Sequence, residues 1–395
     1  MLYIHIPFCK SRCIYCDFYS TTCGSDVQKA YLEALCREME LRRDYLGLDH
    51  ELSSVYIGGG TPSVLGVESL NNIFSAISRH WSLASDAEVT LEVNPDDVSP
   101  DYAQSLTRLP VNRVSMGVQS FNDEMLRFLR RRHTAAQVHS AIRNLLDAGI
   151  TNLSIDLIYG LPGQTLDDWQ SDLDQAFALP ISHLSAYALS YEQGTALYRL
   201  REQGKVKEAD EELSLSQYRM LMERAAVAGF LHYEISNFAL PCLQARHNSG
   251  YWSGKHYLGL GPSAHSYNGI SRQWNNPDLR EYIHRFEDGA AANCGSNSEY
   301  SEELTPGMRR EETILTQLRR AEGIDLSAFS ENFGEQECET LLTRAIPYIN
   351  NGTLVLNEVA CNSFGEPNNQ HEREKFLSLT KKGLFVSDDI ISSLF

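Results

Sequence analysis

The chain has 395 residues, of which 42 % are hydrophobic and 22 % charged, a composition typical of folded globular proteins that excludes collagen-like and disordered chains. Its formal net charge of −18 opposes binding to nucleic acids, and the densest basic run, at residues 130–132, is too short to offset it. No apolar run is long enough to span a membrane, and the start, MLYIHIPFC, lacks the pattern of a signal peptide. We therefore expect a cytoplasmic protein with no nucleic-acid partner that is not an integral membrane protein.

Short strand-like runs alternate with helical patterns through the first half of the chain. The runs predict six strands, at Leu2–Ile6, Ser53–Ile57, Glu88–Val93, Asn112–Met116, Asn152–Ile158 and His183–Leu189. Helical patterns fill the gaps between them, for example at Asp26–Arg43, Val67–His80 and Thr165–Leu179. Six βα units are too few for a closed eight-stranded barrel, so the sequence predicts an α/β fold with a partial (β/α)6 barrel over residues 1–235.

The alternation ends near residue 235. Residues 236–300 are rich in Gly, Asn, His and aromatic residues and are expected to form a connecting segment that leads into a polar linker at residues 289–306. The remaining residues, 301–395, predict a smaller C-terminal domain that is helical and winged-helix-like. The signals for it are helical patterns at Arg309–Arg320 and Glu335–Tyr348, a strand at residues 350–356 and a short helix through Glu372–Thr380.

Three of the nine cysteines, Cys9, Cys13 and Cys16, crowd together directly after the first predicted strand. In a reducing compartment, this spacing favours a metal site over a disulfide framework. Three thiolates would leave one iron of a [4Fe–4S] cluster without a protein ligand and free to bind a small molecule. A zinc site, with His5 or a distant residue as its fourth ligand, is the alternative that the cysteines alone leave open.

Glycine-rich and polar segments stand at the C-terminal ends of the predicted strands, where parallel sheets place their ligands. The cysteines follow the first strand, and GGGTP at residues 58–62 follows the second. Glu92, Gln119 and Asp156 stand at or near the ends of the next three. Glycines let the backbone approach a ligand closely, and the three polar side chains can bind it by hydrogen bonds. Together these segments predict one pocket for a polar cofactor.

The segments YIHIPFCxxxCxYC, GGGTP, LEVNP, GVQSF and IDLIYGLPGQ stand in this order along the chain. They resemble the radical S-adenosylmethionine (SAM) superfamily, in its coproporphyrinogen III dehydrogenase-like branch, over most of the chain. The resemblance implies a [4Fe–4S] cluster whose open iron binds SAM, and three cluster ligands, Cys9, Cys13 and Cys16. The SAM-binding residues that it implies are Tyr3, Tyr15, Gly59, Gly60, Thr61, Glu92, Gln119, Arg131 and Asp156. For Arg131, the run of three arginines allows the register to slip by one residue.

Two functions occur within this branch, and the resemblance implies one or the other. Oxygen-independent coproporphyrinogen III dehydrogenase decarboxylates two propionates in heme biosynthesis, whereas HemW-like chaperones bind heme and deliver it to hemoproteins such as membrane-associated respiratory enzymes. The dehydrogenases carry a further cysteine where this chain has Phe18, and an extension before the first strand, whereas here Tyr3 stands near the start of the sequence. We therefore expect a heme chaperone and leave enzymatic activity open, with the dehydrogenase as the alternative.

The motif HNSGYW at residues 247–252 is associated with heme binding in HemW-like proteins. A neutral imidazole is a good axial ligand for heme iron, and Tyr and Trp offer flat apolar faces to a porphyrin. We expect His247 to be this ligand, on a polar stretch outside the barrel that can move to release heme. His256 and His265 are rival ligands, and a merely hydrogen-bonded His247 in an aromatic-rich loop is the alternative.

Overall fold

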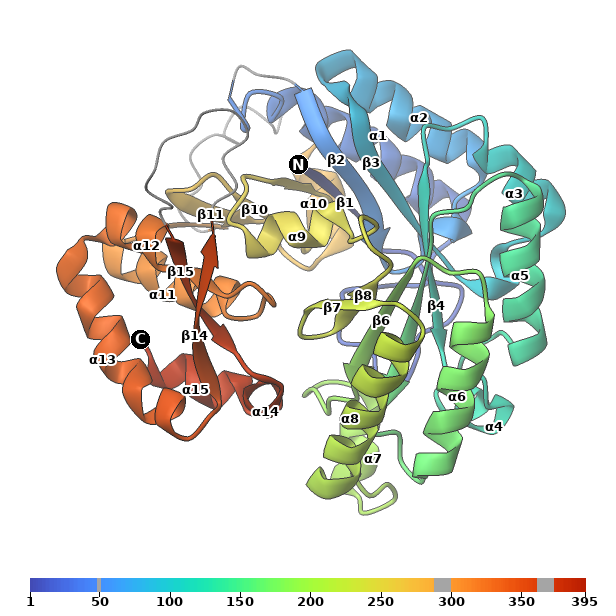
Figure 1. Cartoon of the computed structure of the whole chain (residues 1–395). Coiled ribbons are helices and arrows are strands. Elements are labelled where there is room, and N and C mark those ends of the chain that lie inside the picture. The colour runs from blue at the N-terminus through green and yellow to red at the C-terminus, as the bar shows by residue number, and fades with distance from the viewer. Residues whose placement is uncertain (48–50, 288–299, 361–372) are drawn as a thin grey trace. The chain divides into compact units, whose positions relative to one another are not determined.

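The chain divides into two compact units (Figure 1). The computed structural model describes residues 1–47, 51–287, 300–360 and 373–395. The first unit consists of Met1–Leu231, Ser236–His247 and His256–Glu302. The second unit consists of His232–Ile235, Asn248–Lys255 and Glu303–Phe395. Among the described residues, no helix is both long enough and apolar enough to span a bilayer.

A parallel sheet forms the centre of the first unit. Its six principal strands are β1 (Leu2–Ile6), β2 (Glu51–Gly59), β3 (Ser82–Val93), β4 (Arg113–Gln119), β5 (Leu153–Tyr159) and β6 (His183–Ala188). They lie in the order β6-β5-β4-β3-β2-β1, and every neighbouring pair is parallel. This arrangement confirms the predicted α/β fold with six βα units. Strands that were not predicted extend the sheet at both edges, among them β8 (Asn237–Ala239), antiparallel to β6, and β9 (Leu258–Leu260), parallel to β1.

Helices connect the strands, and Figure 1 shows α2, α3, α5 and α6 along the outer side of the sheet. The helices before residue 231 are α1 (Ser25–Leu41), α2 (Val67–His80), α3 (Pro100–Leu106), α4 (Asp123–Phe128), α5 (Ala135–Asp147), α6 (Leu166–Ala178), α7 (Ala196–Glu202) and α8 (Glu211–Val227). They confirm the predicted helices at α1, α2 and α6. Helix α6 begins where it does because Thr165 and Asp168 form a capping box, and it buries Trp169 and Leu173.

Apolar and polar side chains alternate along the strands of the sheet, as the two-residue period of a strand requires. Ile4, Ile57 and Leu91 lie in register on one face and are buried among other apolar side chains. The opposite face is polar and mostly buried, and we call it the polar face. Its members include Tyr3, His5, Ser54, Tyr56, Glu88, Thr90, Glu92, Arg113, Ser115, Ser154, Asp156, His183 and Ser185.

A buried carboxylate joins α1 to the last part of the first unit. Glu38 on α1 is 0 % exposed and accepts a hydrogen bond from the backbone N–H of Gly261 at 2.8 Å. It also accepts from the side-chain amide of Asn275 at 2.8 Å and the hydroxyl of Tyr282 at 2.7 Å. Arg42, one turn later, lies 3.3 Å from the same carboxylate. These bonds hold a later segment of the chain against α1. The segment contains β10 (His265–Tyr267), β11 (Ser271–Trp274) and α10 (Leu279–Arg285).

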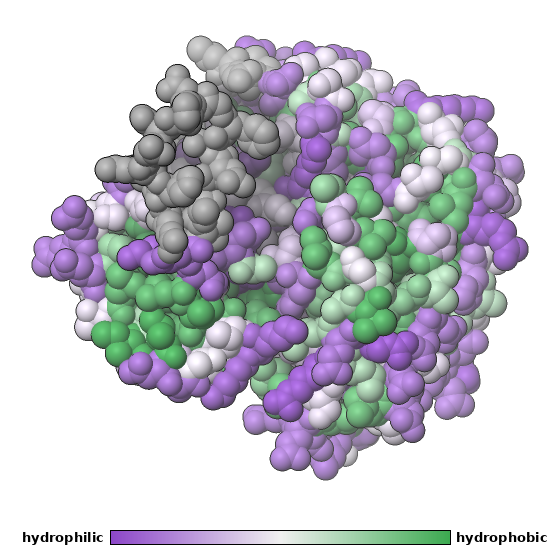
Figure 2. All heavy atoms as spheres, in the orientation of Figure 1, coloured by the Kyte–Doolittle hydropathy of each residue, from purple (hydrophilic) through white to green (hydrophobic). Residues whose placement is uncertain are grey.

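The second unit has its own apolar core, which contains Leu318, Ile324, Phe329 and Leu377. Its elements after residue 303 are α11 (Pro306–Gln317), β13 (Ile324–Asp325), α12 (Leu326–Phe333), α13 (Glu335–Asn350), β14 (Leu354–Ala360), β15 (Arg373–Leu379), α14 (Lys381–Leu384) and α15 (Ser387–Ser393). Two short elements, β7 (Leu231–Glu234) and α9 (Arg246–Trp252), include residues of both units. Figure 2 shows hydrophobic side chains on the surface of the second unit, whose exposed apolar residues include Ile346, Leu356 and Val386.

Three predicted elements of this region are confirmed by α11, α13 and β14. The prediction of a helix through Glu372–Thr380 is wrong. Arg373–Leu379 form β15, which pairs antiparallel with β14 over seven residues and with β13. Pairing with a neighbouring strand outweighs the weak local preference for a helix. Most of the polar linker expected at residues 289–306 lies outside the described residues, and the described part contains β12 (Ser301–Glu303) and the start of α11.

Replacing Glu38 by Ala should destabilise the protein by about 3–5 kcal/mol, because it leaves the donors of Gly261, Asn275 and Tyr282 and the Arg42 guanidinium without their common acceptor. Urea denaturation followed by circular dichroism measures the change. Glu40→Ala is the matched control, since Glu40 is exposed on the same helix, and it should shift stability by less than about 0.5 kcal/mol. Equal effects of the two substitutions would contradict the anchoring role of Glu38.

Candidate cofactor-binding site at the strand ends

The three clustered cysteines lie on the loop that follows β1, at the carboxyl end of the parallel sheet. The end of β2 holds this loop in place. The N–H of Gly60 donates to the carbonyl of Ile6 at 2.7 Å, and that of Thr61 to the carbonyl of Phe8 at 2.8 Å. A Cβ on Gly60 would lie 2.8 Å from the Phe8 oxygen and 3.1 Å from Cys9 Sγ. Glycine is therefore required where the two segments approach each other.

The three thiols are free and close enough to influence one another. Burial raises the pKa of the Cys16 thiol to about 11, and the nearby Cys13 and Cys9 add to the increase. Among the residues that the structure describes, no three His, Cys, Asp or Glu side chains converge on a point where one metal ion could sit. Each thiolate ligand of a [4Fe–4S] cluster binds a different iron, and three free thiols on one loop are the donor set that such a group needs.

Arg131 joins the cysteine loop to the ends of β3 and β4. Its Nη1 donates to Cys13 Sγ at 3.3 Å, and its Nη2 to the carbonyl of Gly117 at 2.5 Å and to Asn94 Oδ1. Its neighbour Arg132 instead forms an ion pair with Asp96 at 2.8 Å. Of the three consecutive arginines, Arg131 is therefore the one that contacts a cysteine of the site.

Two partly buried carboxylates, Glu92 on β3 and Asp156 on β5, lie on the polar face. Glu92 accepts hydrogen bonds from the Tyr56 hydroxyl at 2.7 Å and from the N–H of Gly59 at 3.1 Å. Burial raises the pKa of Glu92 to about 7 and that of Asp156 to about 6. Both carboxyls are thus poised to ionise near neutral pH, and a bound group with positive charge would favour their ionised forms.

Gln119 ends β4 in the left-handed region, with φ of 71°, beside an irregularity in the pairing of β4 with β5. Residues other than glycine rarely adopt this conformation, and those that do concentrate at functional sites. Asp172 on α6 holds the chain here, because its carboxylate accepts from the Ser120 hydroxyl at 2.8 Å and from the N–H of Phe121 at 2.7 Å. The conformation of Gln119 therefore depends on a side chain of another element.

The two tyrosines predicted for the site lie on different elements. On β1, the hydroxyl of Tyr3 is 3.1 Å from His5 Nδ1, and His5 Nε2 is 2.8 Å from the carbonyl of Tyr19. Since a carbonyl can only accept, Nε2 carries the proton and Nδ1 accepts from Tyr3. Tyr15, in the cysteine loop, packs against the apolar cluster that contains Leu129. Each tyrosine is thus held by neighbours, Tyr3 by a hydrogen bond and Tyr15 by packing.

His247 lies on α9, and the expectation that it sits on a mobile stretch outside the barrel is wrong. Its side chain is 1 % exposed, and its Nδ1 lies 2.9 Å from the Ser54 hydroxyl on β2. Glu88 on β3 accepts from the N–H of His247 at 3.0 Å and of Arg246 at 2.9 Å, because a buried carboxylate needs donors. Burial lowers the pKa of His247 to about 3. Its role as a heme ligand stays a prediction.

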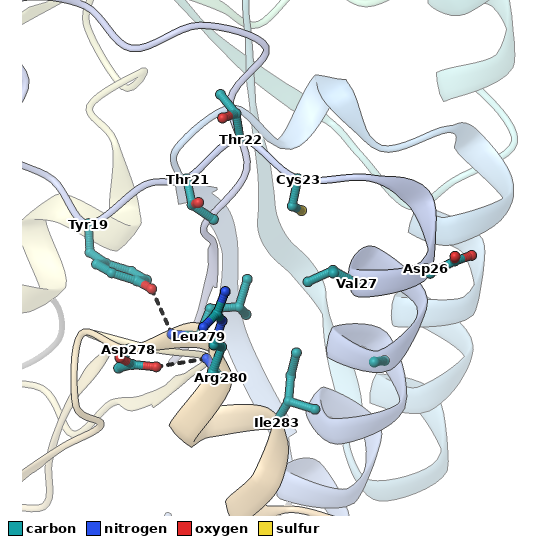
Figure 3. A pocket seen from close by; sticks show the side chains of 11 residues that line it. Tyr19, Thr21, Thr22, Cys23, Asp26, Val27, Asp278, Leu279, Arg280 and Ile283 are labelled. Atoms are coloured by element: carbon teal, nitrogen blue, oxygen red, sulfur yellow. Dashed lines mark hydrogen bonds between the residues drawn. The ribbon is translucent and has the colours of Figure 1, made fainter.

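A cavity of about 640 Å³ lies beside the segment that follows the cysteines (Figure 3). Tyr19, Cys23, Val27 and Leu279 are among the residues that line it. The Tyr19 hydroxyl points toward the start of α10, where it accepts the N–H of Leu279 at 2.6 Å. The cavity contains none of the predicted cofactor-binding residues, so it is distinct from the site at the strand ends.

Asn94, Arg113 and Asp172 belong to the site although no role was predicted for them. Arg113 is buried on β4, and its charge lowers the pKa of both Glu92 and Asp156. The alternation of polar residues along β3 and β4 is a signal that could have found Arg113. Asp172 gives no such signal, because a carboxylate on an amphipathic helix is normally expected to face solvent.

Comparison with known proteins gives related sequences and a related fold. The family model of the radical SAM superfamily matches residues 3–176. The chain is 34 % identical over 342 residues to heme chaperone HemW of Lactococcus lactis subsp. lactis (strain IL1403), covering 86 % of this chain and 88 % of the relative. It is 36 % identical over 329 residues to heme chaperone HemW of Mycobacterium tuberculosis, covering 82 % and 83 %. The solved structure of coproporphyrinogen III oxidase (HemN) from Escherichia coli shares its fold, with a TM-score of 0.80 at 22 % identity over 100 % of this chain and 89 % of that one.

Replacing Glu92 by Gln should make stability less dependent on pH. The pKa of Glu92 is raised to about 7 in the folded protein. The contribution of the protonated Glu92 to the free energy of unfolding is therefore fully present at low pH and is lost as pH rises from about 4.5 toward 7. A glutamine amide imitates the protonated carboxyl, so the stability of Glu92→Gln relative to the wild type should grow by about 2–3 kcal/mol between pH 5 and pH 8. Urea denaturation of the ligand-free protein at both pH values tests this, and parallel pH profiles of the two proteins would contradict it.

Proposed function

This chain belongs to the radical SAM superfamily and, within it, to the family of HemW heme chaperones, and from that membership we propose that it binds a [4Fe–4S] cluster, SAM and heme and passes the heme to other proteins. The observation that carries the proposal is the position of the cysteine loop. It follows β1, next to the glycines that end β2, and Arg131 reaches one of its thiols. A cluster held there would lie beside the polar face, where SAM can be bound.

The proposed cluster ligands are Cys9, Cys13 and Cys16, and the fourth iron would bind the amino and carboxylate groups of SAM. When bound, the cluster supplies an electron and this open iron. Glu92 and Asp156 suit the positively charged part of SAM, because both carboxyls are held ready to ionise. The proposed SAM-binding residues are Tyr3, Tyr15, Gly59, Gly60, Thr61, Glu92, Gln119, Arg131 and Asp156.

Two observations favour a chaperone over coproporphyrinogen III dehydrogenase. The relatives at 34 % and 36 % identity are heme chaperones, whereas the likeness to HemN is one of fold. Phe18, which is 62 % exposed, stands where the dehydrogenases have a further cysteine. The proposed partners are heme and recipient hemoproteins, with membrane-associated respiratory enzymes as the first candidates. The proposed place of action is the cytoplasm, a reducing compartment that keeps the three thiols available for iron.

The identity of the axial ligand is a separate question from whether heme is bound. The sequence predicts His247, with His256 and His265 as rivals. Binding of iron at His247 would require this side chain to leave its buried position and its contact with Ser54. The proposal that heme is bound does not depend on this one residue.

Incubating the anaerobically reconstituted protein with SAM, a reductant and coproporphyrinogen III should yield no decarboxylated product. Hemin added to the same preparation should give a Soret band, because a carrier binds the finished porphyrin. Chromatographic analysis of the porphyrins and absorption spectroscopy provide the two measurements. Turnover at rates typical of enzymes would reject the chaperone in favour of the dehydrogenase.

Replacing Cys9, Cys13 and Cys16 together by Ala should lower the iron content after reconstitution from about four per chain to near zero and remove the visible absorbance. The protein should remain folded, since its core is built by the strands and helices rather than by this loop. Iron analysis and circular dichroism test the two statements. Cys36→Ala is the control, because Cys36 lies on α1, and it should keep its iron. Full iron content in the triple variant would show that the cluster ligands are wrongly assigned.

A further inference from the structure

A buried carboxylate lies beside the cysteine loop. Asp97 ends the short turn that follows β3, and its side chain is 2 % exposed. Lys10 Nζ donates to Asp97 Oδ1 at 2.5 Å, and the hydroxyl of Ser63 donates to Asp97 Oδ2 at 2.8 Å. Arg132 Nη2 lies 3.4 Å from both oxygens. A buried carboxylate is stable only where it has such donors, and we call these four residues the Asp97 network.

The partners of Asp97 come from three segments that are far apart in the chain. Lys10 belongs to the cysteine loop, Ser63 follows the GGGTP segment at the end of β2, and Arg132 lies between α4 and α5. Arg132 also pairs with Asp96 at 2.8 Å, so two cations meet two carboxylates. One carboxylate therefore joins the cysteine loop to two other segments of the site without burying an unpaired charge.

The backbone holds the cysteine loop on both sides of Lys10 but not at Lys10 itself. The N–H groups of Cys9 and Ile14 donate to carbonyls of other segments at 3.0 and 3.3 Å. Within the described residues, no backbone–backbone hydrogen bond reaches residues 10–12, and all three of these residues are exposed. The side chain of Lys10 therefore holds a stretch of the loop that the backbone does not.

The Asp97 network is also connected to Cys13. The Ser63 hydroxyl that donates to Asp97 accepts from the N–H of Asn94 at 3.1 Å. Asn94 Oδ1 in turn accepts from Arg131, whose Nη1 donates to Cys13 Sγ at 3.3 Å. One connected set of hydrogen bonds thus reaches the loop at two places, next to its first cysteine and at its second.

The pair of Lys10 and Asp97 differs from an ordinary surface ion pair because one partner is buried. Lys10 is 50 % exposed, whereas Asp97 is held by Ser63 and Arg132 whether or not the ammonium is present. The carboxylate is thus a fixed acceptor, and only Lys10 loses conformational freedom when the pair forms. The contact can therefore order the loop at a small cost in entropy.

We propose that Asp97 is a positioning residue of the cluster site. By binding Lys10, it holds the stretch between the first two cysteines in the conformation that receives iron. This inference rests on the proposed function, because it requires a cluster on the three cysteines. Residues behind the ligands of a metal commonly set how tightly the metal is held, and their loss costs about 10- to 100-fold in affinity. A cluster held by three thiolates depends strongly on how those thiolates are spaced.

The rate at which the cluster loses iron to a chelator tests this assignment. The full chain is reconstituted anaerobically and mixed with a reductant and ferrozine, and the absorbance of the iron–ferrozine complex is followed. Lys10→Gln should release iron about fivefold faster than the wild type, and Asp97→Asn about tenfold faster. The double variant should match Asp97→Asn, since both substitutions remove the same contact.

Two further variants of the cysteine loop are the matched controls. Arg12→Gln removes an exposed positive charge but leaves the pair of Lys10 and Asp97, so it should release iron at the wild-type rate. Lys10→Arg keeps the charge and should release iron within about twofold of the wild-type rate. Urea denaturation of ligand-free Lys10→Gln should match that of the wild type, which separates an effect on the loop from a loss of overall stability.

Equal rates of iron loss in the wild type, Lys10→Gln and Asp97→Asn would overturn the inference and leave the proposed function intact. An equal acceleration in Arg12→Gln would overturn it as well, because the charge of the loop, and not its contact with Asp97, would then control the cluster. If the wild-type chain takes up no iron, the proposed function fails, and the positioning role of Asp97 fails with it.

Discussion

The parallel sheet of the first unit buries both of its faces, although one of them is polar, and much of the structure serves to satisfy that polar face. Parallel strands buried on both sides are usually apolar throughout, because a buried polar group without a partner is costly. Here His183 Nδ1 lies 2.7 Å from the Ser154 hydroxyl, and Glu92 accepts from Tyr56. Glu88 obtains its donors from the start of α9, beyond residue 235. The sheet therefore depends on segments outside its own βα units.

The sequence predicts those strands and helices whose own residues show a periodic apolar pattern. Each of the six strands and the helices α1, α2, α6, α11 and α13 has the periodic apolar pattern of its type, and each lies near its expected place. Position at a strand end also predicts where the cysteines, Gly60 and Glu92 come together, since parallel strands end at one edge of the sheet. These predictions need no knowledge of contacts between distant segments.

The predictions that failed depend on such contacts. β15 is a strand because β14 lies beside it, and β9 joins the sheet because β1 offers an edge. His247 is buried because Glu88 and Ser54, which precede it by 159 and 193 residues, bind its backbone and its ring. A motif read alone shows which side chains are available for chemistry. It does not show whether the fold uses them for binding or for its own stability.

The contacts of Glu38 also bear on the order in which the chain folds as it is synthesised. Its partners Gly261, Asn275 and Tyr282 follow it by 223 to 244 residues. Until the ribosome has made them, the Glu38 carboxylate has only Arg42 as a partner among these groups, so α1 cannot complete its packing first. Contacts between residues so far apart in the sequence form slowly. Apolar strands therefore stay exposed for longer, and exposed apolar strands can aggregate. The packing of α1 can therefore be completed only after Tyr282 has been synthesised.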